Sequence, residues 1–263
     1  MQLMNSFTEE TLWEMLDIPG AGESLPAALT IETVHAAVAS ERYHVLGAPS
    51  VKMLTRISGT GLAPWEIHRP QKFVRDLVLR GCFAGRVLDA GCGIGDNALF
   101  IAKACPQAHV TAVDVSPRCV AFATAKAGLR RMTHGMVTLE TASLTEPVPE
   151  RQAACISSPA ADGAFDVVLD SSTFHCFSDS DRELYVASLR RLIRPGGKLF
   201  VNCMSEAETR PGGPRRVAVA ELLAVFNRMS GWEVEVIEDS IIELHPTFWG
   251  GRAVSRLFTV RKL

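Results

Sequence analysis

The stretch VLDAGCGIGDN, residues 87–97, joins three alternating glycines to carboxylates on either side. An apolar, β-branched segment precedes it, and the helix-like segment NALFIAKA follows from its last residue. Because glycine has no Cβ, such a turn lets backbone N–H groups and a helix N-terminus approach a ligand closely. The stretch therefore predicts a binding turn for a cofactor.

The spacing of acidic residues separates two cofactors, a nicotinamide dinucleotide and S-adenosylmethionine. The dinucleotide fingerprint expects a glycine three residues after Gly93, where this chain has Asp96. A carboxylate there would repel a pyrophosphate, whereas the amino acid end of S-adenosylmethionine carries an ammonium group that pairs with acids. Asp114 lies 19 residues beyond Gly95, at the end of the next predicted strand, where it can accept hydrogen bonds from both ribose hydroxyls. Together these residues favour S-adenosylmethionine.

A second group of residues lies where a methyl acceptor would bind. Methyl transfer requires the acceptor atom about 3 Å from the methyl carbon, and a general base only when the acceptor carries a proton of high pKa. His175 is the candidate base, with an alternative as a helix-start histidine bonded to backbone. Asp170 is expected to orient the histidine or the cofactor ammonium, or else to cap the following turn. The other residues expected at this site are Ser171, Phe174, Asn202, Met204 and Ser205.

Three further candidates lie outside these strand ends. Trp65 could stabilise the sulfonium through a cation–π contact, or anchor the N-terminal segment on the sheet. Arg215, with Arg216, could bind an anionic or carbonyl-bearing acceptor, or stay in solvent before a helix. Trp249, with Phe248, could form an aromatic lid, or close a hairpin.

The elements that must position these residues alternate between short β-branched strands and helices from about residue 86, which predicts a mostly parallel α/β sheet. The last two strands have no helix between them and should pair as an antiparallel hairpin, giving seven strands with one reversed. Residues 147–163 read as a surface loop. The predicted strands are 86–90, 109–114, 136–141, 165–170, 198–204, 232–238 and 254–261, and the predicted helices are about 95–105, 117–130, 180–194 and 216–229.

The N-terminal region follows a different pattern. FTEETLWEML and IETVHAAVASERYHVL both look helical and are separated by PGAGESLP. We therefore expect an N-terminal helical arm or cap over residues 1–62, followed by a catalytic domain over residues 63–263.

With the motifs VLDAGCGIGD, VDVSP, FDVVLD and LRRLIRPGGKLFV, residues 65–262 resemble the class I S-adenosylmethionine-dependent methyltransferases. The resemblance implies a seven-stranded Rossmann-like methyltransferase sheet. It also implies that Asp114 binds the ribose, that Val115 flanks the adenine, and that Ser143 stands where the family often has an acid for the adenine amine. The full cofactor set expected is Trp65, Asp89, Gly91, Cys92, Gly93, Asp96, Asp114, Val115, Ser143, Leu144 and Asp170, and the expected substrate contacts are Phe174, His175, Met204, Arg215 and Trp249.

A narrower resemblance rests on PWEIHRPQ, GDNALFIA, LDSSTFHCFSD and PGGPRRV. These motifs look like those of the thiopurine, thiol and halide methyltransferases, especially an actinobacterial branch of benzoquinone and other small-molecule methyltransferases. The resemblance implies methyl transfer to oxygen, or to nitrogen or sulfur, of a small aromatic or quinone-like metabolite. The alternatives are a thiol or thiopurine S-methyltransferase and a non-catalytic S-adenosylmethionine-binding partner or regulatory protein. A nicotinamide reductase is a third alternative, and Asp96 disfavours it.

Composition limits the partners and the compartment. The net charge is −2 and no lysine- or arginine-rich run occurs, so a nucleic-acid partner is not expected. No apolar run is long enough to span a bilayer, and no Lys or Arg precedes Arg42, so we expect no membrane partner and a cytoplasmic protein. The seven cysteines are irregularly spaced, which favours free thiols over a metal site or a disulfide framework. We expect a monomer or a homodimer.

Overall fold

The computed structural model describes residues 30–40, 57–146 and 154–263. Within them, one seven-stranded sheet has the order β3-β2-β1-β4-β5-β7-β6. Strand β7 runs antiparallel to β5 and β6, whereas the other neighbouring strands are parallel. The predicted fold, with one reversed strand, is therefore confirmed. The strands are β1 (Gly85–Ala90), β2 (Ala108–Asp114), β3 (Val137–Thr141), β4 (Phe165–Ser171), β5 (Ile193–Met204), β6 (Trp232–Glu243) and β7 (Arg252–Lys262).

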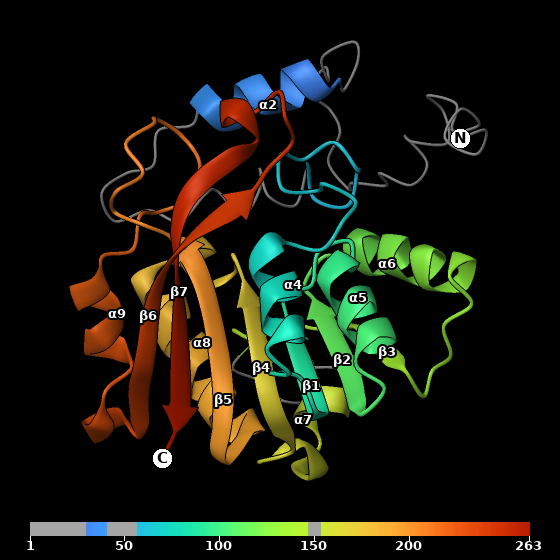
Figure 1. The fold of residues 1–263 in the computed structure, drawn as a ribbon, viewed down its shortest axis with the longest axis vertical. Helices are drawn as coiled ribbons and strands as arrows, with labels where there is room; N and C mark the ends of the chain where they lie inside the picture. Colours follow the sequence, from blue (N-terminus) through green and yellow to red (C-terminus); the bar gives the residue numbers. More distant parts are fainter. Residues whose placement is uncertain (1–29, 41–56, 147–153) are drawn as a thin grey trace.

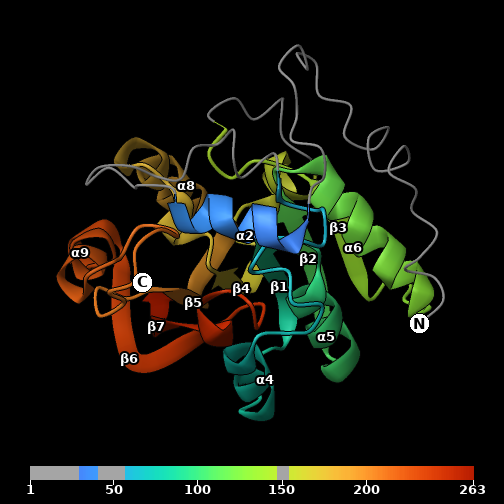
Figure 2. The ribbon, with the colours of Figure 1, turned by 90° about the horizontal axis from the view of Figure 1, so that it is seen from above.

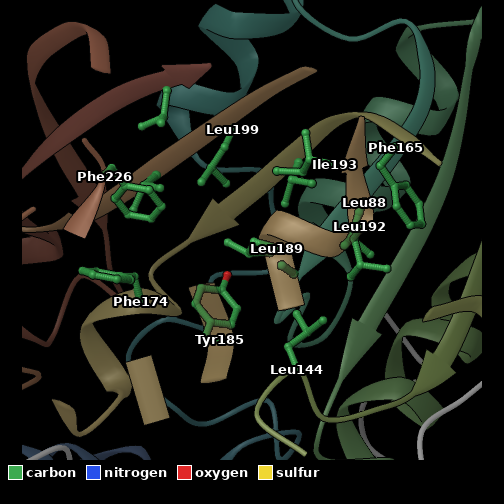
Figure 3. Packing of buried hydrophobic residues seen from close by; sticks show 14 of the residues in the cluster. Leu88, Leu144, Phe165, Phe174, Tyr185, Leu189, Leu192, Ile193, Leu199 and Phe226 are labelled. Atoms are coloured by element: carbon green, nitrogen blue, oxygen red, sulfur yellow. The ribbon is translucent and has the colours of Figure 1, made fainter. Parts of the chain in front are cut away.

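Helices cover both faces of this sheet (Figure 1). Side chains along each strand alternate between two apolar cores, so Val167 and Leu169 of β4 face one core and Val168 faces the other. The first core contains residues of α4 (Lys72–Leu79), α5 (Asp96–Ala104) and α6 (Pro117–Leu129). The second contains residues of α7 (Ala154–Ser157), α8 (Asp179–Leu192) and α9 (Val219–Val225). Figure 3 shows Tyr185 and Leu189 of α8 packed against sheet residues of the second core.

Several predicted boundaries need correction. The predicted helix over 216–229 is shorter, because α9 ends at Val225 and Asn227 caps a separate 3₁₀ turn, η4 (Arg228–Ser230). The described part of the predicted loop 147–163 contains α7 and the 3₁₀ turn η2 (Pro159–Ala161). Helix α4 was not predicted. It follows PWEIHRPQ and buries Phe73, Val74 and Leu77 along one face.

Helix α2 (Ile31–Ser40) confirms the first part of the helix expected in IETVHAAVASERYHVL. Residues 41–56 and the other predicted arm helix, FTEETLWEML, lie outside the described residues. Seen from above in Figure 2, α2 crosses the edge of the sheet where the parallel strands end. Val34 and Val38 of α2 pack in one cluster with Met204, at the end of β5, and with Phe248. Helix α2 therefore covers the place where the acceptor residues were predicted.

In the part of the chain that the model describes, no helix is both long and apolar enough to span a bilayer.

Candidate functional site

The glycine turn after β1 has the geometry of a binding turn. Gly91, Gly93 and Gly95 all adopt positive φ, at 80°, 53° and 81°. A Cβ on Gly91 would lie 2.2 Å from Oγ1 of Thr173, whereas a Cβ on Gly93 would meet no atom within 4 Å. The Gly95 residue caps α5 and approaches Ala123 of α6 so closely that a Cβ would lie 2.6 Å from the alanine Cβ. The turn therefore packs tightly on both sides and opens at its centre.

Asp89, inside β1, carries a carboxylate that the surrounding protein leaves unpaired. Asp89 is fully buried, and neither of its carboxylate oxygens has a hydrogen-bond partner among the described residues. Burial, followed by the charges of Asp114 and Asp170, raises the pKa of Asp89 to about 7. A buried unpaired carboxylate is costly, and a cationic partner removes the cost. Asp89 beside the open Gly93 therefore fits the ammonium end of S-adenosylmethionine.

Asp114 ends β2 and holds the same turn. Its Oδ2 accepts the Gly93 N–H at 2.8 Å, and its Oδ1 accepts the Ser116 N–H at 2.9 Å. Burial raises the pKa of Asp114, and the two backbone hydrogen bonds oppose that rise. Each carboxylate oxygen retains acceptor capacity for a ribose hydroxyl. The next residue, Val115, leaves 69% of its surface exposed, which suits an apolar face for an adenine ring.

Asp96 has a different environment from the one the sequence argument gave it. Its carboxylate lies 2.8 Å from Nζ of Lys126 and 3.6 Å from a guanidinium nitrogen of Arg130, both at the end of α6. The side chains of Asp96 and Lys126 are both largely buried. Asp96 thus joins α5 to α6 through Oδ2, while its Oδ1 accepts no hydrogen bond among the described residues; in Asp89 both oxygens are without a hydrogen bond.

The remaining predicted cofactor residues differ in the groups that they expose to a ligand. The Ser143 hydroxyl lies 3.1 Å from Oγ1 of Thr145 and accepts the Thr145 N–H at 3.3 Å. Leu144 and Cys92 are buried, each in one of the two sheet cores. Trp65 is half-buried and packs against the cluster that contains α2 residues. Leu144 and Cys92 therefore offer a ligand mainly their backbone.

Asp170 ends the buried part of β4 and organises the turn after it. Its Oδ1 accepts the Thr173 N–H at 2.8 Å, and its Oδ2 accepts the Phe174 N–H at 3.0 Å and the Tyr185 hydroxyl at 2.7 Å. Burial raises the pKa of Asp170 to about 6, although these hydrogen bonds favour the carboxylate. Asp170 therefore caps the 3₁₀ turn η3 (Phe174–Cys176), which was the structural alternative for this residue.

His175 lies in this turn and contacts the end of β5. Its Nδ1 accepts the Met204 N–H at 3.0 Å, and only 3% of the residue is exposed. Burial, followed by the positive charges of Arg182 and Arg216, lowers the pKa of His175 to about 3. The imidazole is therefore neutral, and with Nδ1 as acceptor the hydrogen is assigned to Nε2. The backbone-bonded alternative is thus the arrangement that the structure has.

The η3 turn also packs directly on the cofactor turn. Thr173, its N-cap residue, donates a hydrogen bond from Oγ1 to the Ala90 carbonyl at 2.8 Å. The same Thr173 side chain fills the space where a Gly91 Cβ would lie. The two segments predicted separately from the sequence, Asp89–Gly95 and Asp170–His175, therefore form one continuous site.

Phe174 and Arg215 do not have the surroundings predicted for substrate contacts. Phe174 is fully buried, with the Phe226 ring 5.8 Å away and the Arg182 guanidinium 4.4 Å from its ring centre. Arg215 forms ion pairs with Asp179 and, at 2.5 Å, with Glu221. In this structure the Phe174 ring is core packing, and the Arg215 guanidinium is bound by protein carboxylates.

Trp249 lies in the β6–β7 connection, in the 3₁₀ turn η5 (Trp249–Gly251). The guanidinium groups of Arg210 and Arg216 lie 5.0 Å and 5.6 Å from its ring centre, and the Phe248 ring lies 4.6 Å away. Trp249 also adopts a positive φ of 51°, which is uncommon for a large side chain. With α2 it borders a cavity of about 350 Å³ that is also lined by Glu32, His35, Ala36, Ala39, Thr247 and Phe248. Trp249 is thus fixed in place beside the α2 cover.

Sequence reasoning missed Glu66, in PWEIHRP. This buried carboxylate accepts the N–H groups of Gly59 and Gly61 at 2.5 and 2.6 Å, and burial raises its pKa to about 7. Arg118, at the start of α6, donates to the Ser58 carbonyl at 2.8 Å. Glu66 therefore closes residues 59–66 into a loop, and Arg118 joins this loop to α6 through Ser58. An acid flanked by Trp65 and Ile67 was the available signal.

Arg182 and Tyr185 of α8 were also missed. Arg182 donates from Nε to the Phe174 carbonyl at 3.3 Å, and Tyr185 donates to Asp170. Both residues hold the η3 turn from a helix that begins after it. Their helical spacing indicated only a buried face.

Comparisons with known proteins agree with this geometry. Residues 87–197 match the family model of a methyltransferase domain. The chain is 30% identical to the 2-heptyl-1-hydroxyquinolin-4(1H)-one methyltransferase of Mycobacteroides abscessus, over 66% of this chain and 70% of that protein. It is also 30% identical to the probable thiol methyltransferase 2 of Arabidopsis thaliana, over 71% of this chain and 76% of that protein.

The fold has a counterpart among solved structures. An S-adenosylmethionine-dependent methyltransferase from Anabaena variabilis matches with a TM-score of 0.63 at 16% identity, covering 85% of this chain and 100% of that one. At this identity the likeness concerns the fold alone. Taken with the two relatives and the glycine turn, it establishes the family. The chain belongs to the class I S-adenosylmethionine-dependent methyltransferases, and it acts on small molecules.

Proposed function

We propose that the protein transfers a methyl group from S-adenosylmethionine to an oxygen, or to a nitrogen or sulfur, of a small aromatic or quinone-like metabolite. The observation that carries this proposal is the contact between Thr173 and Gly91, which places the His175 turn directly beside the cofactor turn. The two relatives at 30% identity are named for a hydroxyquinolone and for a thiol acceptor. Both names support a compact acceptor with a nucleophilic heteroatom.

The chain contributes binding and orientation to this reaction. When bound, S-adenosylmethionine supplies a methyl group activated by a positively charged sulfur. Asp89 would pair with the ammonium group of the cofactor, and Asp114 would accept hydrogen bonds from its ribose hydroxyls. The open space over Gly93 would let the cofactor approach the backbone of the turn. Asp170, Arg182 and Tyr185 hold the η3 turn in place, and α2 excludes water from the acceptor side.

Thiol methylation is the second candidate, and the Arabidopsis relative favours it. A thiolate is a strong nucleophile and needs no base at the site. Oxygen and sulfur acceptors place the same demands on the part of the site around Asp89 and Asp114, the cofactor half. They differ in whether a base is needed in the part around Asp170 and His175, the acceptor half.

The test is a methyl-transfer assay with labelled S-adenosylmethionine and three matched acceptor panels: hydroxyquinolines, substituted phenols and aromatic thiols. We expect labelled product from at least one panel and none from the Asp89→Ala variant. Calorimetry with S-adenosylhomocysteine checks that the wild-type protein binds the cofactor product. Binding without turnover on any panel would contradict the proposed acceptor class.

A further inference from the structure

We infer that the acceptor site takes substrates that are already ionised at the reacting oxygen or sulfur, and that neutral His175 donates its Nε2–H to that anion. This inference rests on the proposed function and narrows its substrate class. It replaces the role of a base, which the sequence suggested for His175, by the role of a hydrogen-bond donor.

The acceptor nitrogen of His175 already has a hydrogen-bond partner. A neutral imidazole has one acceptor nitrogen and one donor nitrogen. The Met204 N–H takes the acceptor, Nδ1, at 3.0 Å. Taking a proton at Nδ1 would break that hydrogen bond and leave a buried N–H of β5 unpaired. Only the Nε2–H remains to contact an acceptor, and it donates.

Residues from several elements set the charge around the imidazole of His175. Arg182 of α8 and Arg216, before α9, are the charged groups whose fields act on it, and both oppose protonation. Asp170 of β4 is the acid at the base of its turn, and Cys176 and Cys203 are the neighbouring thiols, whose pKa values burial raises. On the α2 side, Glu32, His35 and His245 interact with one another. The two charges that act on the imidazole are therefore both positive and oppose its protonation, and Arg182 is itself ion-paired with Glu221.

The Asp170 carboxylate, which caps this turn, is already occupied by hydrogen bonds from the protein. Its two oxygens accept hydrogen bonds from the backbone N–H groups of Thr173 and Phe174 and from the Tyr185 hydroxyl. Removing any of these would loosen the turn that carries His175. Asp170 is a positioning residue here and does not serve as a base.

The chemistry balances without a proton transfer at the site. The acceptor loses its proton to solvent before or during binding. Its oxygen or sulfur anion supplies the electron pair of the new bond to the methyl carbon, while the pair of the broken carbon–sulfur bond stays on the departing sulfur. The two products are neutral at the reacting atoms. The matching substrates are acidic phenols, N-hydroxy heterocycles and aromatic thiols, and alkyl alcohols are excluded.

Turnover of phenols that differ in pKa tests the inference. We expect kcat/KM for 4-nitrophenol, 4-cyanophenol and phenol to rise with pH along a limb whose midpoint follows the pKa of each acceptor. A midpoint that stays at one pH for all three phenols would identify an enzyme base and overturn the inference.

Binding gives a readout that is independent of turnover. The probe is 4-nitrophenol added to the protein with S-adenosylhomocysteine, at a pH about one unit below the pKa of the free dye, where most of the dye is neutral. We expect the phenolate absorbance band on binding and the release of about one proton to the buffer, measured by calorimetry in phosphate and in Tris. The phenolate band without proton release would mean that the protein takes the proton, which overturns the inference, as would no binding.

Two variants separate the roles of His175. His175→Gln keeps a side-chain donor and an acceptor for Met204 but cannot take a proton, so we expect it to keep activity within about tenfold. His175→Ala removes the donor, and we expect a loss of about 10- to 100-fold. Equal and large losses in both variants, with unchanged circular dichroism, would count against a donor role. Proton-releasing binding with no methyl transfer to any panel would overturn the proposed function alone.

Discussion

The two halves of the site lie at the same edge of the sheet but are built in opposite ways. In the cofactor half, the Asp89 carboxylate has no hydrogen-bond partner among the described residues, and the space over Gly93 is open. In the acceptor half, Asp170, His175 and Arg215 already have protein partners. One half keeps polar groups for a ligand that never varies. In the other half most polar groups hold the local fold, and the Nε2–H of His175 is the group left for the acceptor, which must fit that fixed shape.

The largest expected effect comes from filling the Gly91 position. In Gly91→Ala the new Cβ would lie 2.2 Å from Thr173 Oγ1, on a backbone with a φ of 80°. Because this contact joins the two halves, we expect more than about 100-fold weaker binding of S-adenosylhomocysteine by calorimetry. Gly81→Ala is the matched control, since Gly81 also has a positive φ, at 71°, its Cβ would meet no atom within 4 Å, and it lies outside the cofactor turn, so binding should change little. Equal losses would mean that backbone conformation alone matters.

The next effect concerns the unpaired carboxylate. We expect Asp89→Asn to weaken S-adenosylmethionine binding by about 10- to 100-fold, as for loss of a charge-assisted hydrogen bond. The pKa of free Asp89 is raised to about 7, and an ammonium partner lowers it in the complex. Affinity should therefore be full above pH 7 and fall as the pH drops below 7, because a proton must leave first. The Asn variant should show no such fall, and a pH-independent wild type would exclude Asp89 as the partner.

The acceptor half is tested by Tyr185→Phe, which removes a 2.7 Å hydrogen bond to the Asp170 carboxylate. We expect a loss of about 1.5 to 3 kcal/mol in the free energy of unfolding, measured with urea. Binding of S-adenosylhomocysteine should change less than twofold, because the cofactor half does not use Tyr185. A large change in that binding would show that the two halves are coupled through α8.

The smallest effect is expected at Arg215. Its ion pairs with Asp179 and Glu221 involve partly exposed carboxylates, so Arg215→Ala should cost less than about 1 kcal/mol of stability. If the guanidinium is occupied by these carboxylates, the KM of an acceptor should stay within about twofold. A tenfold rise in KM would instead support the substrate contact that the sequence predicted.

The same contrast explains what could be predicted from sequence. The glycine turn and Asp114 are local features of a strand, a turn and a helix, so their roles follow from spacing. Within Phe174–His175, by contrast, spacing cannot tell which ring enters the core, because a 3₁₀ turn directs adjacent side chains differently. The ion pair between Asp96 and Lys126 could not be predicted from local spacing, because Lys126 lies on another helix. The contacts that define the acceptor half join residues from β4, β5 and α8, and no local pattern encodes them.

The packing of α2 on the site links the rates of acceptor entry and product release to the packing of this helix. Met204 is 2% exposed, and so are Val34 and Val38, which pack in the same cluster. If an acceptor approaches the end of β5 through this cluster, it displaces these valines, at a cost of about 1.5 kcal/mol each. An uncovered state would then be populated about one hundredth of the time. Entry of acceptor and departure of methylated product share this opening, so trimming Val34 or Val38 should shorten the residence time of product without altering the methyl-transfer step.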